Sequence, residues 1–241
     1  MRTTVVLPIY NEAEIIGRVF REVHRFAMGN HDYRFLFVDD GSIDESPQIL
    51  RELVRPGANP SLDILHYSPN RGKGFAVKMG IEQSETEFVC FTDGDLAYSL
   101  DHLPVLVAAL ESHDVVVGSR NLTGEKQTNI EFSRRIMGWG FNLLARFLLK
   151  LPYHDTQAGL KGFRLEAAKQ IVARQQIVDF CFDAELLFLA RRLGFSIAEV
   201  PARVSHSHVY RGSQVNLRRD PPRMLLSLVR ICCNSAQGKY D

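Results

Sequence analysis

The chain of 241 residues has little net charge, few cysteines and no long apolar run. A formal net charge of +1 offers no general attraction for nucleic acid, so we expect no nucleic acid partner. The four cysteines show neither zinc-site spacing nor a secreted disulfide framework, which favours a reduced, cytosolic compartment. Because no stretch of about 18 apolar residues and no signal-peptide pattern is present, we expect no membrane-spanning helix.

Short apolar runs alternate with amphipathic segments as far as residue 118. Strands are expected at 4–7, 33–38, 62–67, 88–92 and 114–118, with helices between them. We expect Asn11 and Ser46 to cap two of these helices. The alternation predicts an α/β fold, a mostly parallel sheet with helices on both faces. Beyond residue 118 we expect helices at 132–150, 183–193 and 224–233 and strands at 159–163 and 197–200.

Acidic residues close two of the expected strands. Asp39 and Asp40 follow the apolar run 35–38, and Asp93 and Asp95 follow the run 88–92. The carboxyl ends of parallel strands form the edge where open α/β sheets bind ligands. Closely spaced carboxylates suit a hard cation, and a hard cation suits a diphosphate. The pattern favours a metal-bound nucleotide, although each acidic pair also fits an ordinary turn.

A glycine-rich basic loop, Asn70-Arg71-Gly72-Lys73-Gly74, precedes an expected helix. Its glycines permit close backbone approach, and its cations could meet phosphate. The spacing and the absent terminal Ser or Thr exclude a Walker loop. A flexible basic loop without a ligand fits the same residues equally well.

Together these motifs resemble family 2 glycosyltransferases, which have the nucleotide-sugar-binding GT-A fold. Residues 7–12 (LPIYNE), 38–42 (VDDGS), 70–74 (NRGKG) and 93–95 (DGD) occur in the family's order. Residues 118–120 (GSR) and 155–163 (DTQAGLKGF) are similar to the polyprenyl-phosphate sugar synthases, more to their dolichyl-phosphate β-glucosyltransferase branch than to their mannose synthase branch. We therefore expect a GT-A glycosyltransferase domain over 1–216 and a C-terminal amphipathic helix over 217–241.

The resemblance implies a donor site. Its nucleotide-binding residues would be Pro8, Tyr10, Glu12, Asp39, Asp40, Lys73 and Asp93, with one of the adjacent acids at the base. Asp95, with Asp93 beside it, would hold Mg²⁺ or Mn²⁺. Mannose synthases have a glutamine two residues further on, where this chain has Ala97, so water would complete the metal shell. Since turn acids seldom stabilise a core, we expect Asp40→Ala to weaken nucleotide binding with little loss of fold.

The resemblance also implies an acceptor site. Arg120, Arg134 and Arg211 would surround the phosphates, and Asp155 would anchor sugar hydroxyls or a neighbouring arginine. Asp93, Asp95, Arg120 and Asp155 would form the catalytic set. The implied reaction is inverting transfer of a hexose, from UDP-glucose in preference to GDP-mannose, to a polyprenyl or dolichyl phosphate, which needs no strong base.

Two other functions fit the same residues. A soluble glycosyltransferase with a small hydroxyl acceptor would require a general base, for which Asp155 and Asp183 are candidates. A non-catalytic nucleotide-sugar-binding protein would keep the fold without turnover.

Two expected helices carry apolar stripes that could lie in a membrane surface. The first stripe is Ile136, Trp139, Phe141, Leu144, Phe147 and Leu148, and the second is Met224, Leu225, Leu228, Val229 and Cys232. Arg223 and Arg230 are available for anionic lipids. This pattern favours a peripheral protein on the cytoplasmic membrane face, and the alternative is that both helices pack on the core. The oligomeric state stays open.

Overall fold

The computed structural model describes residues 1–54, 60–123, 132–204 and 220–241, without the side chains of 132–137 and 220–221. The strands are β1 (Thr3–Ile9), β2 (Tyr33–Asp40), β3 (Leu62–Tyr67), β4 (Phe88–Phe91), β5 (Val115–Ser119), β6 (Lys161–Arg164) and β7 (Ile197–Pro201). The helices are α1 (Ala13–Gly29), α2 (Ser46–Leu53), α3 (Lys73–Glu82), α4 (Leu103–Leu110), α5 (Phe132–Leu148), α6 (Leu165–Arg174), α7 (Phe182–Arg192) and α8 (Asp220–Ala236).

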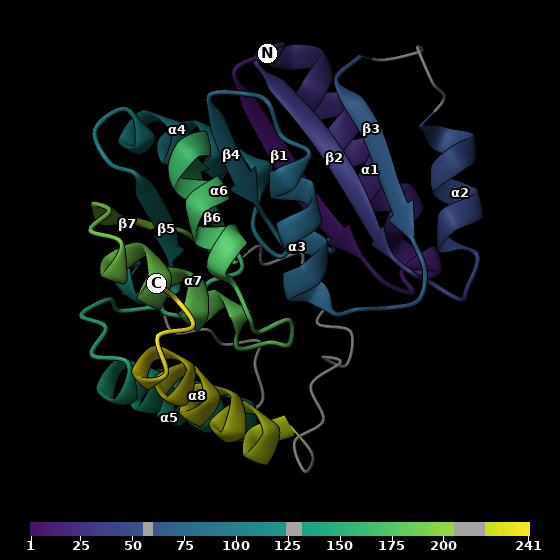
Figure 1. Ribbon diagram of the computed structural model, residues 1–241. Helices are drawn as coiled ribbons and strands as arrows, with labels where there is room; N and C mark the ends of the chain where they lie inside the picture. The colour runs from purple at the N-terminus through teal and green to yellow at the C-terminus, as the bar shows by residue number, and fades with distance from the viewer. Residues whose placement is uncertain (55–59, 124–131, 205–219) are drawn as a thin grey trace.

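The seven strands form one sheet in the order β3-β2-β1-β4-β6-β5-β7. Neighbouring strands are parallel, except that β6 runs antiparallel to both β4 and β5. The expected α/β fold with a mostly parallel sheet is therefore confirmed. In Figure 1, α3 and α6 lie in front of the sheet, while α1 and α4 lie behind it.

The apolar strand runs are explained by burial on both faces of the sheet. All seven residues of β1 are buried. Val6 packs with α3, α6 and α7, while its neighbours Val5 and Leu7 pack with α1 and α4, as the two-residue period of a strand requires. Helix α6, which contributes Ile171 to this core, was not expected from the sequence.

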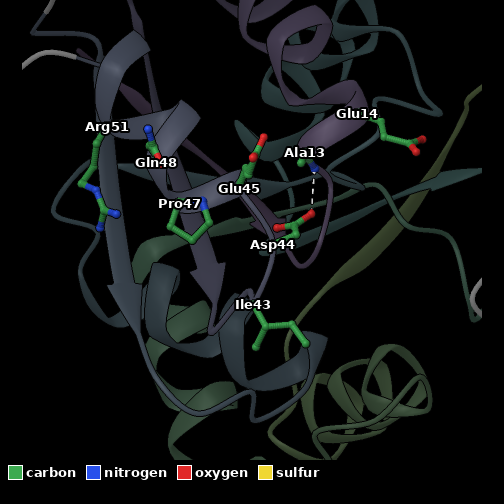
Figure 2. A pocket seen from close by; sticks show the side chains of 8 residues that line it. All are labelled: Ala13, Glu14, Ile43, Asp44, Glu45, Pro47, Gln48 and Arg51. Carbon is green, nitrogen blue, oxygen red and sulfur yellow. Dashed lines mark hydrogen bonds between the residues drawn. The ribbon is translucent and has the colours of Figure 1, made fainter.

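The helix caps expected from Asn11 and Ser46 are wrong, because neither side chain caps its own helix. Instead, Glu12 N donates to Ser46 Oγ at 2.8 Å, and Ala13 N donates to Asp44 Oδ2 at 3.1 Å. Figure 2 shows the second bond. The turn after β2 therefore satisfies the backbone N–H groups at the start of α1, which fastens the ends of β1 and β2 together.

Asp40 ends β2 inside the protein and is 2% exposed. Its Oδ1 accepts bonds from Tyr67 Oη at 2.7 Å and Arg71 N at 2.8 Å. Its Oδ2 accepts bonds from Asn70 Nδ2 at 2.8 Å and Gly72 N at 2.9 Å. Four donors thus occupy both oxygens, and Asp40 anchors the turn that begins α3.

Asp39 is equally enclosed, with no exposed surface. Its Oδ1 accepts a bond from Ser42 N at 3.1 Å, and its Oδ2 lies 2.6 Å from His66 Nδ1. Both acids therefore have structural partners at the end of β3 and in the turns that frame the carboxyl edge of the sheet.

The apolar stripes expected on the last two long helices turn mostly inward. Phe141, Leu144, Leu148, Met224 and Cys232 pack against the core, and Leu228 is fully buried. Four other members of the predicted stripes are exposed, Trp139 (68%) and Phe147 (79%) on α5 and Leu225 and Val229 on α8, and the side chain of Ile136 lies outside the described part. Leu143 on α5 and Leu226 (67%) on α8 are exposed with these four. We name these six residues the α5–α8 face. The two helices lie side by side beneath the sheet in Figure 1.

Along the described ranges, no helix combines the length and the apolar character needed to cross a bilayer.

The burial of Asp40 corrects the expectation that its removal leaves the fold nearly unchanged. Asp40→Ala leaves four donors without their acceptor, so we predict a loss of about 3 kcal/mol or more in the free energy of unfolding. Asp63→Ala is the matched control, since Asp63 is half exposed and pairs with Arg34 at the surface; its loss should stay below about 1 kcal/mol. Urea unfolding measures both, and equal small losses would contradict the anchoring role.

Candidate active site at the carboxyl edge of the sheet

An ion pair joins the basic turn to the acidic motif. Lys73 Nζ, at the start of α3, contacts Asp93 Oδ1, just beyond β4. Burial opposes the charge of Lys73, but Asp93, with Asp183 and Asp95, outweighs it and raises the pKa of Lys73. A cation and two carboxylates therefore share one corner, as a site for a metal-bound diphosphate requires.

Asp93 and Asp95 supply the carboxylate oxygens that a metal ion could use at this corner. Asp95 Oδ1 accepts a bond from Ala97 N at 3.0 Å, which shapes the turn. Among the described residues, no group of three or more His, Cys, Asp and Glu side chains could hold a metal ion. Magnesium is typically bound through one or two carboxylates together with substrate phosphates. The residues present fit that kind of site, and not a cage built from protein ligands alone.

Arg120 and Asp155 form a two-pronged ion pair across the edge. Arg120 Nε donates to Asp155 Oδ2 at 2.7 Å, and its Nη2 donates to Oδ1 at 2.9 Å. Burial alone would raise the pKa of Asp155, but the bonds and charge of Arg120 hold it below its usual value. The arginine side chain is 31% exposed, so it can still meet a ligand.

Lys161 is a third cation at this edge, and the sequence analysis assigned it no role. Lys161 on β6 is fully buried, and its Nζ donates at 2.5 Å both to Asp183 Oδ1 and to Ala158 O. Burial raises the pKa of Asp183, although Lys161 and Lys73 oppose that shift. The signal available in the sequence was a lysine inside an apolar strand, which is rare without a buried partner.

Glycine brings the neighbouring backbone against Asp93. A Cβ atom on Gly159 would lie 2.1 Å from Asp93 Oδ2, and one on Gly94 would lie 2.3 Å from Pro8 O. The segment before β6 and the end of β1 therefore enclose the acidic motif from two sides. Pro8 is buried, while Tyr10 and Glu12 are partly exposed beside it.

Three buried hydroxyls around this edge have no hydrogen-bond partner within the described chain: Thr92 Oγ1, Tyr98 Oη and Ser119 Oγ. Thr92 precedes Asp93, and Ser119 precedes Arg120. Burial raises the pKa of Tyr98, so its hydroxyl stays protonated. These groups add polar capacity to the candidate site.

Two of the predicted phosphate-binding arginines cannot be positioned. Arg211 lies outside the described residues. Arg134 belongs to α5, but its side chain lies outside the described part. The structure therefore brings together Lys73, Asp93 and Asp95, and sets the pair of Arg120 and Asp155 at the same sheet edge.

A surface cavity lies over the joined turns and contains none of the predicted site residues (Figure 2). It is lined by Ala13, Glu14, Ile43, Asp44, Glu45, Pro47, Gln48 and Arg51.

Comparison with known proteins agrees with this geometry. The model of the family "Glycosyl transferase family 2" matches residues 4–172. A dolichyl-phosphate beta-glucosyltransferase of Trichomonas vaginalis is 32% identical over 83% of this chain and 62% of its own length. An undecaprenyl-phosphate mannosyltransferase of Micrococcus luteus is 30% identical over 83% of this chain and 82% of its own. The chain thus spans less than two thirds of the glucosyltransferase relatives it matches.

Solved structures agree on the fold. Glucosyl-3-phosphoglycerate synthase from Mycobacterium tuberculosis in complex with UDP superposes with a TM-score of 0.67 at 18% identity, over 96% of this chain and 80% of that one. The same enzyme with Mn²⁺, UDP and glucosyl-3-phosphoglycerate gives a TM-score of 0.63 at 19% identity, over 94% and 79%. The family match over most of the chain, on a GT-A sheet with acids at its carboxyl edge, identifies this chain as a member of glycosyl transferase family 2.

Proposed function

We propose that this chain is a glycosyltransferase that transfers glucose, with inversion, from UDP-glucose to a polyprenyl phosphate. The observation that carries the proposal is that two charged clusters, each able to bind phosphate, lie at one edge of the sheet. Lys73, Asp93 and Asp95 supply a place for a metal-bound diphosphate, and Arg120 supplies a cation for a second phosphate. Relatives named for dolichyl-phosphate glucosyl transfer and undecaprenyl-phosphate mannosyl transfer support both a sugar donor and a lipid-phosphate acceptor.

On the donor side, Asp95 and Asp93 would hold Mg²⁺ or Mn²⁺. That ion would neutralise charge on the leaving diphosphate when bound. Lys73 adds a fixed positive charge beside Asp93, so the diphosphate meets a cation that is already oriented. Neighbours whose titles include UDP with Mn²⁺ or Mg²⁺ support the choice of nucleotide and metal.

On the acceptor side, Arg120 binds and orients the lipid phosphate. Its planar fork is held by Asp155 through two bonds, which fixes the guanidinium before the ligand arrives. A phosphate oxyanion is already a nucleophile, so it attacks the anomeric carbon without a base. The bond to the diphosphate breaks as the new bond forms on the opposite face.

The two candidates for the base that a hydroxyl acceptor would require are both engaged in ion pairs. Asp155 pairs with Arg120, and Asp183 pairs with Lys161. Against the effect of burial, Arg120 lowers the pKa of Asp155, which makes its carboxylate a poor proton acceptor. Asp183 is only 5% exposed, so a soluble hydroxyl has little access to it. This observation favours the lipid-phosphate acceptor over the small hydroxyl acceptor.

The direct test combines purified protein with either UDP-glucose or GDP-mannose, together with a polyprenyl phosphate and Mg²⁺ or Mn²⁺. We predict a lipid-extractable hexosyl phosphate from UDP-glucose, with the anomeric configuration inverted by NMR. If product forms from GDP-mannose alone, GDP-mannose replaces UDP-glucose as the proposed donor. If no lipid product forms and the sugar appears on a soluble hydroxyl compound, that hydroxyl replaces the polyprenyl phosphate as the proposed acceptor.

Removal of the metal ligand should stop transfer. We predict that Asp95→Ala lowers kcat at least about 100-fold, the order of magnitude lost with one electrostatic stabilising group, and that excess chelator does the same to the wild type. Asp101→Ala is the matched control, because Asp101 is an exposed acid six residues further on, bonded to Ser99. Full wild-type activity in excess chelator would exclude the metal-dependent mechanism.

We also propose that the α5–α8 face rests on the cytoplasmic surface of an anionic membrane. Trp139, Phe147 and Leu226 are the most exposed of its six apolar side chains. The exposed cations Lys150, Arg223 and Arg230 lie on or next to the same two helices. Aromatic and cationic side chains together suit the headgroup boundary, and a lipid acceptor must be met there.

Vesicle sedimentation tests this surface. We predict that the protein sediments with anionic vesicles at low salt and is released at high salt, since each surface cation contributes about 1 kcal/mol. Phe147→Ser should weaken binding several-fold. Ile43→Ser is the matched control, because Ile43 is 87% exposed but lines the cavity with residues of α1 and α2 and belongs to neither α5 nor α8. Equal effects of both substitutions, or no sedimentation with vesicles in excess, would contradict this surface.

A further inference from the structure

The turn that carries Lys73 is supported from a second side by residues 175–178. Gly74 N donates to Val178 O at 3.0 Å, and Gln175 Nε2 donates to Gly74 O at 3.0 Å. A Cβ atom on Gly72 would lie 2.5 Å from Val178 O, so the two backbones are in direct contact. The position of this segment therefore sets the position of the lysine backbone.

Residues 175–178 lie between α6 and α7 and have no strand or helix to fix them. Their backbone is held by Glu185, which belongs to α7 and has no exposed surface. Its Oε2 accepts bonds from Ile177 N at 2.8 Å and Gln176 N at 3.2 Å, and its Oε1 lies 3.1 Å from Gln176 N. A buried carboxylate is costly unless donors surround it, and here those donors are the segment's own amides.

Tyr240, which follows α8 in the chain, is a further hydrogen-bond donor to the Glu185 carboxylate. Tyr240 Oη donates to Glu185 Oε1 at 2.5 Å, and the side chain is 1% exposed. The backbone of Tyr240 is held as well, because Arg174 Nε donates to its carbonyl oxygen at 3.1 Å. The residues after α8 thus reach the same carboxylate that fixes the segment behind Lys73.

We propose that Glu185 is a positioning residue for donor binding, with Tyr240 as its support. Glu185 fixes residues 175–178, these fix the turn from Gly72 to Gly74, and the turn aims Lys73 at Asp93. Glu185 reaches the reaction only through this turn. The inference rests on the proposed function in one respect, that Lys73 and Asp93 receive the donor diphosphate.

Three substitutions test the relay at separate points. Tyr240→Phe removes the hydroxyl alone, and Glu185→Gln replaces the carboxylate. Gln175→Met removes the side-chain bonds to Gly74 O and Ile177 O without altering Glu185. Tyr33→Phe is the matched control, since Tyr33 is 7% exposed and packs on the opposite face of the sheet. Ile16→Val, in the same opposite core, controls for a general loss of stability.

We predict that Tyr240→Phe and Gln175→Met each raise the Kd for UDP with Mn²⁺ and the KM for donor about tenfold, the effect of losing one strong hydrogen bond. At saturating donor, kcat should change less than twofold. Glu185→Gln should act more strongly in the same direction. Hydrogen exchange at the Gly74 amide should accelerate in all three variants and in neither control.

A purely structural role gives a different result. If Tyr240→Phe and Gln175→Met lower the melting temperature but leave both the Kd for UDP and Gly74 exchange at wild-type values, the proposal is overturned. Should Glu185→Gln fail to fold, the two milder variants still decide the question. UDP binding and hydrogen exchange need no acceptor, so absence of lipid product in the wild type would fail the proposed function without deciding this one.

Discussion

The carboxylate of Asp40 is the interaction on which the candidate site depends. A charge buried at the end of β2 is tolerated because four donors converge on it, and three of those come from the turn after β3. The cost of leaving any of them unpaired holds the turn in one conformation. That turn begins α3 at Lys73, so a buried acid that touches no reacting atom determines where a cation meets the acidic motif.

The same turn is supported on its far side by a second buried acid, Glu185, through a different kind of contact. Asp40 accepts the turn's own amides, while Glu185 accepts the amides of the segment packed against it. Glycines at 72 and 74 make the contact with that segment possible, because a side chain at either position would collide with Val178 O or Phe182. This explains a glycine-rich loop without appeal to flexibility: the glycines allow close packing against residues 175–182.

Much of the sheet edge could be predicted from the sequence because apolar runs mark strands and acids mark their ends. Asp93 and Asp95 follow β4 as expected. Side-chain partners could not be predicted, since they depend on turns distant in sequence. Asp44 and Ser46 bond the start of α1, thirty-one and thirty-four residues away from their partners, and so appear from the sequence as local turn and cap residues. Asp155 holds Arg120 across thirty-five residues for the same reason.

The sequence also could not predict which side of α5 and of α8 packs against the core. On α5 and α8 apolar residues occupy more than one face, so periodicity alone does not say which face meets the core. The structure uses Leu144 and Leu228 for packing and leaves Trp139, Phe147 and Leu226 in solvent. A group of large apolar side chains that the core does not need costs free energy in water and is usually retained for contact. Cations lie beside this group, and the headgroup region of an anionic membrane offers both apolar contact and negative charge. A second copy of the face would instead bring like charges together.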